Sequence, residues 1–162
     1  MMSSGHAART PTEQRRLEEA LRQVFEDHIP FNRVLGLKIE SFDAVAPRTR
    51  FDMRPELVGH YLHGRLHGGT ISAVLDATGG FALMCGIAAK HPEESADQVM
   101  HRFVRIGTID MRIDFLHQGI GERFIADARI TRLGGRIGSV QTSLINEAGT
   151  LIATSSAAYV IS

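Results

Sequence analysis

Hydrophobic residues recur with helical spacing near the beginning of the chain. Leu17, Leu21 and Val24 are separated by four and three residues, which places their side chains on one face of a helix. Thr12 precedes this pattern and is a residue type that commonly caps helices. We therefore predict a helix over about 12–29, with Thr12 as its cap.

A second apolar segment runs from His67 to Ala89 and carries almost no charge. Its apolar side chains would surround the whole circumference of a helix, so we expect a helix that is buried on most sides. Residues 90–105 are polar, and we interpret them as an excursion or lid outside the core.

The last third of the chain alternates apolar and polar residues, as in strands with one buried face. The first of these strands places four apolar residues on one face, namely Ile109, Met111, Ile113 and Phe115. We predict strands over 108–116, 124–133, 137–145 and 151–161. Partial alternation over 37–53 predicts either one bent strand or two short strands around Pro47.

Glycine-containing turns separate the later strands at 119–121, 134–135 and 146–149. Three hairpin connections in succession predict an antiparallel meander. One buried helix together with an antiparallel sheet predicts an α+β fold in which the sheet wraps around the helix.

Length and charge narrow the class of protein. The chain has 162 residues, which fit one domain, and we assign residues 1–11 to a flexible tail and 12–162 to a single domain. Its 18 basic and 18 acidic residues balance, so it lacks the usual electrostatic basis for binding nucleic acid or a membrane surface. The single cysteine, Cys85, excludes an intramolecular disulfide.

The sequence has only weak signals for insertion into a membrane or for export. The longest apolar stretch, 79–89, is too short to span a bilayer, and the polar first residues do not resemble a signal peptide. We expect a soluble, cytoplasmic protein.

Asp76 is the only carboxylate within the predicted buried helix. The residues three and four positions away cannot neutralise its charge; they are Ser72, Ala73, Gly79 and Gly80. A carboxylate in an apolar site needs compensation from elsewhere in the fold or a functional role. Asp76 is therefore either a catalytic group or a structural one that caps amides or pairs with a distant arginine.

His67, Gly68 and Gly69 stand where this helix should begin. Free N–H groups at a helix start attract negative charge, and glycines let another group approach the backbone. Such donors can form an oxyanion hole. The alternative is a glycine turn that leads into a tightly packed helix.

The spacing of these two features predicts an oligomer. Gly68 lies eight residues before Asp76, or about 12 Å along a helix axis. A donor and a carboxylate that act on one carbonyl group must both lie close to it. One chain cannot easily supply both, whereas two antiparallel helices can, so we expect active sites across a homodimer interface.

A turn in the last third is a candidate phosphate site. Arg132 and Arg136 flank Gly134 and Gly135, and two guanidinium groups beside a free backbone can hold phosphate. Solvated arginines at a hairpin tip are the alternative. For metals, the His63–His67 pair lacks a third ligand, and we predict neither a metal nor a cofactor.

Three stretches of the chain carry a family resemblance. RPELVGHYLHGRLHGGTISAVLDATGGFA, GTIDMRIDFLHQG and LIATSSAAYV together resemble the hotdog-fold acyl-CoA thioesterases of the phenylacetate-pathway (PaaI-like) type. The resemblance covers about 37–161 and leaves the N-terminal helix as an addition. It implies a long central helix wrapped by a sheet, two subunits joined into one continuous sheet, and hydrolysis of an acyl-CoA thioester.

The resemblance also implies roles for individual residues. Asp76 matches the catalytic carboxylate, which acts as general base or nucleophile, and Gly68 matches the glycine whose N–H polarises the thioester carbonyl. Thr108 stands where the family often has a Ser or Thr that places the water. Many members carry an Asn shortly before the HGG triplet; here His60 is the stand-in, because an imidazole N–H also donates.

Two other functions stay open from the sequence. A hydratase or dehydratase would need a His near the carboxylate, but Phe81 stands five residues after Asp76, where that branch has its His. The missing Asn would suit a second alternative, a non-catalytic binder of acyl ligands. The acyl specificity is not determined, although Phe81, Met84, Leu116 and residues 90–105 are candidates for an acyl pocket. Arg65, Arg102 and Arg105 are alternative partners for the phosphates of coenzyme A.

Overall fold

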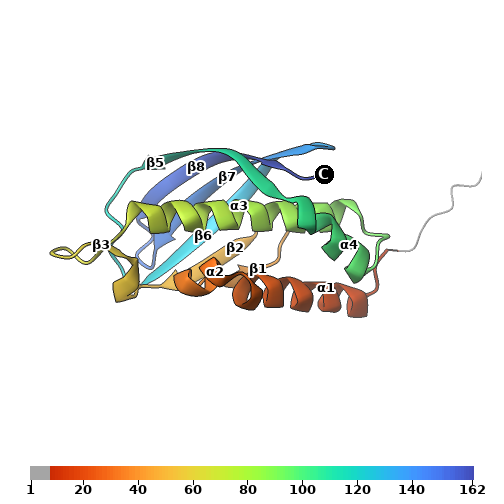
Figure 1. The fold of residues 1–162 in the computed structure, drawn as a ribbon, viewed down its shortest axis with the longest axis horizontal. Coiled ribbons are helices and arrows are strands. Elements are labelled where there is room, and N and C mark those ends of the chain that lie inside the picture. The colour runs from red at the N-terminus through yellow and green to blue at the C-terminus, as the bar shows by residue number, and fades with distance from the viewer. Residues whose placement is uncertain (1–7) are drawn as a thin grey trace, which may run out of the picture.

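The computed structural model describes residues 8–162 as an α+β fold, with a long helix lying across an antiparallel sheet (Figure 1). The α-helices are α1 (Pro11–Gln23), α2 (Pro30–Leu35), α3 (Gly68–Lys90) and α4 (Ala96–Arg102). A π-helical turn η1 (Val24–His28) and two 3-10 turns, η2 (Pro55–Leu57) and η3 (Phe103–Arg105), join them. The strands are β1 (Lys38–Ser41), β2 (Arg48–Asp52), β3 (Val58–His60), β4 (Arg65–Leu66), β5 (Gly107–Phe115), β6 (Arg123–Leu133), β7 (Ile137–Asn146) and β8 (Leu151–Val160).

The predicted buried helix is α3, and it organises the core. His67 caps it, because the imidazole Nδ1 accepts a hydrogen bond from the Gly69 N–H. By length and composition α3 could also cross a membrane, but 61% of its most apolar window is buried inside the fold. Packing against the sheet accounts for its apolar character.

The main sheet has the strand order β1-β2-β6-β7-β8-β5, and all its pairs are antiparallel. The hairpins predicted around 134–135 and 146–149 are confirmed. The one predicted at 119–121 is wrong, because β5 pairs with β8 and forms the far edge of the sheet. The connection passes the start of α3 instead: the Gly119 carbonyl accepts from the Leu66 N–H, and a Cβ on Gly119 would lie 2.8 Å from Leu66 Cβ.

The segment over 37–53 forms two short strands, as one of the two alternatives predicted. In β5 the predicted face is partly wrong, because the register shifts between Thr108 and Asp110. This bulge places Thr108 opposite Tyr159 of β8 and leaves Ile109 55% exposed. Bulges commonly redirect a side chain beside a functional site.

The N-terminal segment departs from a single helix over 12–29. The α-helix begins at Pro11 rather than after Thr12, because Thr10 is the cap and accepts a hydrogen bond from the Glu13 N–H. It continues into η1 and breaks at Ile29, since a residue before proline disfavours helical backbone. Of the predicted tail, residues 1–7 lie outside the described residues.

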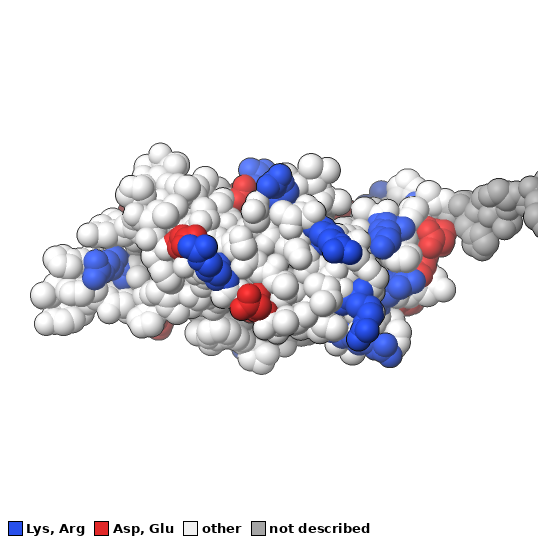
Figure 2. Space-filling model, turned by 90° about the horizontal axis from the view of Figure 1, so that it is seen from above, with Lys and Arg blue, Asp and Glu red and all other residues white. Residues whose placement is uncertain are grey.

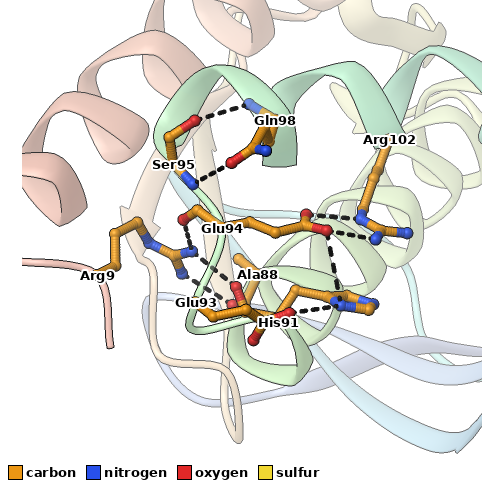
Figure 3. A network of polar contacts seen from close by, with 8 residues as sticks. All are labelled: Arg9, Ala88, His91, Glu93, Glu94, Ser95, Gln98 and Arg102. Atoms are coloured by element: carbon orange, nitrogen blue, oxygen red, sulfur yellow. Dashed lines mark hydrogen bonds and ion pairs between the residues drawn. The ribbon is translucent and has the colours of Figure 1, made fainter. Parts of the chain in front are cut away.

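Residues 90–105 contain α4 and close the C-terminal end of α3 (Figure 3). Arg9 donates hydrogen bonds to the carbonyl groups of Ala88, His91 and Glu94. These are carbonyls at or just beyond the end of a helix, which lack partners within it. Arg9 therefore fastens the beginning of α1 to the end of α3.

Candidate active site

Asp76 lies in the middle of α3, half-buried, and faces the start of β5. The Thr108 hydroxyl donates a hydrogen bond of 2.7 Å to Asp76 Oδ1. The structure thus brings together two residues that the family resemblance pairs, 32 positions apart in the chain. Oδ2 has no hydrogen-bond partner among residues 8–162, which leaves it available to a water molecule.

Tyr159 holds the main chain of the same residue. Its hydroxyl donates a 2.9 Å hydrogen bond to the Asp76 carbonyl oxygen, and its ring is buried. Burial, and then the charge of Asp76, raise the pKa of Tyr159 above its ordinary value, so the phenol stays protonated as a donor. No local sequence pattern predicts this contact, because it joins residues 83 positions apart.

A cavity of about 320 Å³ opens beside Asp76 and Thr108. The two predicted acyl-pocket residues of α3, Phe81 and Met84, line it, but Leu116 does not. The rest of the wall comes from Ala73, Ala77, Gly80, Ile106, Gly107 and Tyr159, and from the N-terminal residues Phe25, Ile29, Phe31 and Asn32. No sequence pattern indicates that the N-terminal residues form part of this cavity wall.

Gly68 lies at the other end of the predicted pair, as the first residue of α3. Among residues 8–162 no group accepts a hydrogen bond from its N–H. It lines a separate cavity of about 530 Å³ together with Leu116 and Phe115. A free N–H at a helix start is the group that an oxyanion hole requires.

The two candidate histidines are placed differently. His67 uses Nδ1 to cap α3, so its lone pair there is engaged. His60 lies in the β3–β4 hairpin, which projects from one end of the molecule (Figure 1). Its ring stacks on His63 at 4.6 Å, and its buried Nδ1 has no hydrogen-bond partner among the described residues.

The predicted phosphate turn is split by the structure. Gly134 and Gly135 line a cavity of about 810 Å³, and Arg132 and Arg136 are exposed and do not line it. Its basic lining comes instead from the C-terminal part of α3 and from 90–105, namely Lys90, His91, His101, Arg102 and Arg105. Figure 2 shows basic side chains gathered toward this end of the molecule.

In residues 8–162, one group of metal-ligating side chains lies within 4.8 Å, and Figure 3 shows it: His91, Glu93 and Glu94. Arg102 forms a hydrogen-bonded ion pair with Glu94. The hydrogen bond from Arg102 lowers the pKa of the Glu94 carboxyl below its ordinary value. A cation bound there would have to displace this ion pair. We therefore interpret the cluster as part of the polar contacts that close the C-terminal end of α3.

Cys85 is buried on α3. Burial, with smaller contributions from Glu18 and Asp43, raises the pKa of its thiol to about 12. The thiolate is the nucleophilic form of cysteine, and this thiol stays protonated near neutral pH. Cys85 is therefore a core residue.

The structure places a carboxylate in mid-helix, a glycine at the helix start and a sheet around that helix, which is the arrangement that the resemblance to the hotdog-fold thioesterases implies. The family model described as "Thioesterase superfamily" matches residues 63–153, more than half of the chain. The chain belongs to the thioesterase superfamily, a family of thioester hydrolases.

Individual relatives agree with this assignment. The chain is 35% identical over 147 residues to the medium/long-chain acyl-CoA thioesterase YigI of Escherichia coli, covering 89% of this chain and 95% of that protein. A Shewanella oneidensis protein related to the thioesterase superfamily superimposes with a TM-score of 0.87 at 33% identity, covering 94% and 99% of the two chains. Mouse thioesterase superfamily member 2 shares the fold, with a TM-score of 0.69 at 22% identity, over 94% and 99%. The predicted hotdog fold is confirmed.

Proposed function

We propose that this protein hydrolyses acyl-CoA thioesters to a free acid and coenzyme A, with Asp76 as the catalytic carboxylate. The observation that carries the proposal is the Asp76–Thr108 hydrogen bond at an apolar cavity. The names of the relatives add the substrate class, since YigI is described as a medium/long-chain acyl-CoA thioesterase. The PaaI-like subtype and a cytoplasmic location stay predictions from the sequence.

Asp76 would act as general base. Its free Oδ2 accepts a proton from water while the water oxygen forms a bond to the thioester carbonyl carbon. The Thr108 hydroxyl fixes the carboxylate by its hydrogen bond to Oδ1. The tetrahedral intermediate then breaks the carbon–sulfur bond, and the proton passes to the departing sulfur. The alternative, direct attack by the carboxylate on the carbonyl, uses the same residue.

The oxyanion donor would come from a second subunit. Gly68 and Asp76 are eight residues apart on one continuous helix, or about 12 Å along its axis. The half-buried side of α3 that carries Asp76 has small side chains, Ser72, Ala73, Ala77 and Gly80, which allow a second helix to approach closely. An antiparallel homodimer brings the Gly68 N–H of one subunit to the Asp76 of the other.

The edge of the sheet supports the same dimer. In one chain β5 is unpaired on its outer side, and Ile109 and Phe115 are each 55% exposed. An open edge strand has unpaired backbone groups that can pair with another strand. Pairing of two β5 strands would join two sheets into one.

The phosphates of coenzyme A would lie in the 810 Å³ cavity at the end of α3. Lys90 and Arg105 supply positive charge there without an ion-pair partner among residues 8–162, whereas Arg102 is paired with Glu94. This assignment replaces Arg132 and Arg136 with Arg105, one of the alternatives from the sequence, and with Lys90, which no motif indicates. Gly134 and Gly135 keep their proposed place.

Release of free thiol from a panel of acyl-CoA substrates tests the proposal, with wild type beside Asp76→Asn. The amide keeps the shape of the carboxylate and its hydrogen bond from Thr108, but it cannot accept the proton of water. We expect kcat to fall by about 10²–10⁴. Asp127→Asn is the matched control, because Asp127 is an exposed carboxylate on β6, outside both the cavity beside Asp76 and the proposed β5 edge.

Three outcomes separate the functions. Loss of turnover in Asp76→Asn alone supports the thioesterase mechanism. Equal turnover in Asp76→Asn and wild type would remove Asp76 from the chemistry. Binding of acyl-CoA without thiol release by the wild type would make the protein a binder instead.

A further inference from the structure

The cavity beside Asp76 has one wall from α3 and another from the N-terminal segment, defined here as residues 11–35. This segment lies outside the part of the chain that the family model matches. Phe25, Ile29 and Phe31 nevertheless line the same cavity as Asp76 and Thr108. The part of the chain that the family model matches thus carries Asp76 and Thr108, and the N-terminal segment carries part of the cavity wall.

The bend in this segment is what presents Ile29 and Phe31 to the cavity. Pro30 ends the helix at Ile29, whose backbone is extended with φ −84° and ψ 108°. The buried Asn32 side chain donates a 2.9 Å hydrogen bond to the Phe25 carbonyl oxygen. That bond ties α2 back onto η1, so the two short elements turn together over the cavity.

The other side of the bend is fastened to the sheet. Glu26 of η1 accepts a hydrogen bond from the Ile39 N–H of β1 and pairs with Lys38 and Arg22. Burial would raise the pKa of Glu26, but the bond from Ile39 and the Lys38 charge outweigh it and lower the pKa. The carboxylate therefore stays ionised near neutral pH and holds the segment in place.

Two buried aromatic rings form part of the cavity wall. The Phe25 and Phe81 rings lie 5.3 Å apart, and both side chains are buried. A methylene group occupies about the volume of a water molecule in the liquid, roughly 30 Å³, so 320 Å³ holds about ten carbon atoms. Within residues 8–162, no lysine or arginine lines this space, which suits a hydrocarbon tail.

We propose that the N-terminal segment sets the acyl-chain selectivity of this enzyme, with Phe31 as the selectivity-determining side chain for linear acyl groups of about eight to twelve carbons. The inference rests on the proposed function and goes beyond it by naming the residues that measure the chain. Phe31 is 58% exposed although it lines the cavity, and a bound tail would cover it. Burying that surface favours substrates long enough to reach it.

Phe31→Ala tests this inference, with Val34→Ala as its control. Both residues lie on α2 with similar exposure, 58% and 55%, but only Phe31 lines the cavity. The readout is the ratio of kcat/KM for decanoyl-CoA to kcat/KM for butyryl-CoA. Because both values come from one preparation, the ratio does not depend on the fraction of folded enzyme.

Each buried methylene group contributes a factor of about four to binding. We expect the ratio to fall about tenfold in Phe31→Ala, which corresponds to losing the burial of between one and two methylene groups of the tail. Val34→Ala should keep the wild-type ratio. Gly80→Ala gives a second measurement from the opposite wall, because the nearest group to a Cβ there is Tyr159 Cε1 at 4.0 Å. The added methyl group occupies cavity space, so the longest chain that is hydrolysed efficiently should shorten by about one carbon.

The outcomes distinguish this inference from the proposed function. Absence of thiol release by the wild type on every acyl-CoA would overturn the proposed function. Hydrolysis with equal ratios in Phe31→Ala and Val34→Ala, and an unchanged chain-length profile in Gly80→Ala, would overturn only the role of the N-terminal segment. A lower ratio in Phe31→Ala alone supports it.

Discussion

The middle of α3 and its N-terminal end are two polar sites on one helix that are built in different ways. Asp76 in the middle is held twice by its own chain, through the Thr108 hydroxyl and the Tyr159 phenol. Gly68 at the end offers an N–H that nothing in residues 8–162 accepts. The carboxylate is complete within one chain, and the donor is not.

The difference fits the roles that we propose for the two groups. A general base works only when its lone pair points at the proton, so its surroundings have to fix it. An oxyanion donor has to stay free until a developing negative charge arrives. If Asp76 and Gly68 act on one thioester, as proposed, the catalytic unit must be larger than one chain, because the two groups lie about 12 Å apart along one helix.

Gly68→Pro removes the free N–H directly, and we expect the largest effect among the variants below. Gly68 is the first residue of α3, a position at which proline fits a helix, and the backbone of His67 at ψ 138° is compatible with a following proline. The substitution removes the N–H while keeping the helix. Loss of one oxyanion donor should lower kcat by about 10²–10³, measured by thiol release.

Gly68→Ala is the control for this variant. It keeps the N–H, and its Cβ would lie at an ordinary contact distance of 3.5 Å from Phe115 Cε1. We expect a far smaller loss than in Gly68→Pro. Similar losses in the two variants would mean that the methyl group, not the missing donor, causes the effect.

Mixing two inactive variants tests whether the sites are shared between subunits. Asp76→Asn and Gly68→Pro each damage both sites of their own homodimer. In a mixed dimer, one site combines an intact Asp76 with an intact Gly68, so random reassembly should restore about a quarter of the wild-type activity. The mixture is unfolded and refolded together before the assay.

A mixture that stays as inactive as its components would contradict the shared site. The control is a mixture assembled from variants that were refolded separately, which should stay inactive if subunits exchange slowly. Equal recovery with and without joint refolding would mean that subunits exchange rapidly between dimers. Sites that lie within one chain would give no recovery in either mixture.

Thr108→Val weakens the fixed end of the comparison. Valine has nearly the shape of threonine but cannot donate to Asp76 Oδ1. The carboxylate then loses its side-chain partner and turns more freely, so we expect kcat to fall about tenfold with a smaller change in KM. Thr108→Ser keeps the hydroxyl and should recover most of the rate; equal losses in both variants would argue for packing instead.

Local patterns explain how much of the fold could be predicted. The buried helix and the later strands follow from periodicity within a few residues, and the structure has them at nearly the predicted bounds. The partner of β5 could not be predicted that way, because strand order depends on contacts between distant segments. Pro30 is itself a local signal for the break at Ile29. The helical spacing, however, continues to His28 and does not predict the π-helical turn over Val24–His28.

The site divides along the same line. Asp76, Gly68 and Thr108 were found through the HGG triplet and the family resemblance, and the Asp76–Thr108 contact is present in the structure. Tyr159 and Phe31 carry no motif, since their roles depend on where β8 and α2 pack against α3. The basic cavity likewise collects residues from α3, α4 and a distant turn.

Two neighbouring glycines on α3 give the smallest and most local test. A Cβ at Gly79 would overlap the Tyr159 hydroxyl oxygen, whereas the nearest atom to a Cβ at Gly80, Tyr159 Cε1, would lie at an ordinary contact distance of 4.0 Å. Gly79→Ala should displace the phenol from the Asp76 carbonyl and lower the free energy of unfolding by about 1–3 kcal/mol. For a domain of this size that corresponds to a fall in Tm of about 2–12 °C in a thermal melt.

Gly80→Ala should instead raise Tm slightly, because alanine loses less backbone entropy than glycine when a helix forms. The pair separates two accounts of Tyr159. If Tyr159 positions Asp76, Gly79→Ala lowers kcat at temperatures far below its Tm, where the protein is fully folded. If Tyr159 only packs α3 against β8, Gly79→Ala lowers Tm and leaves kcat at those temperatures as it is in the wild type.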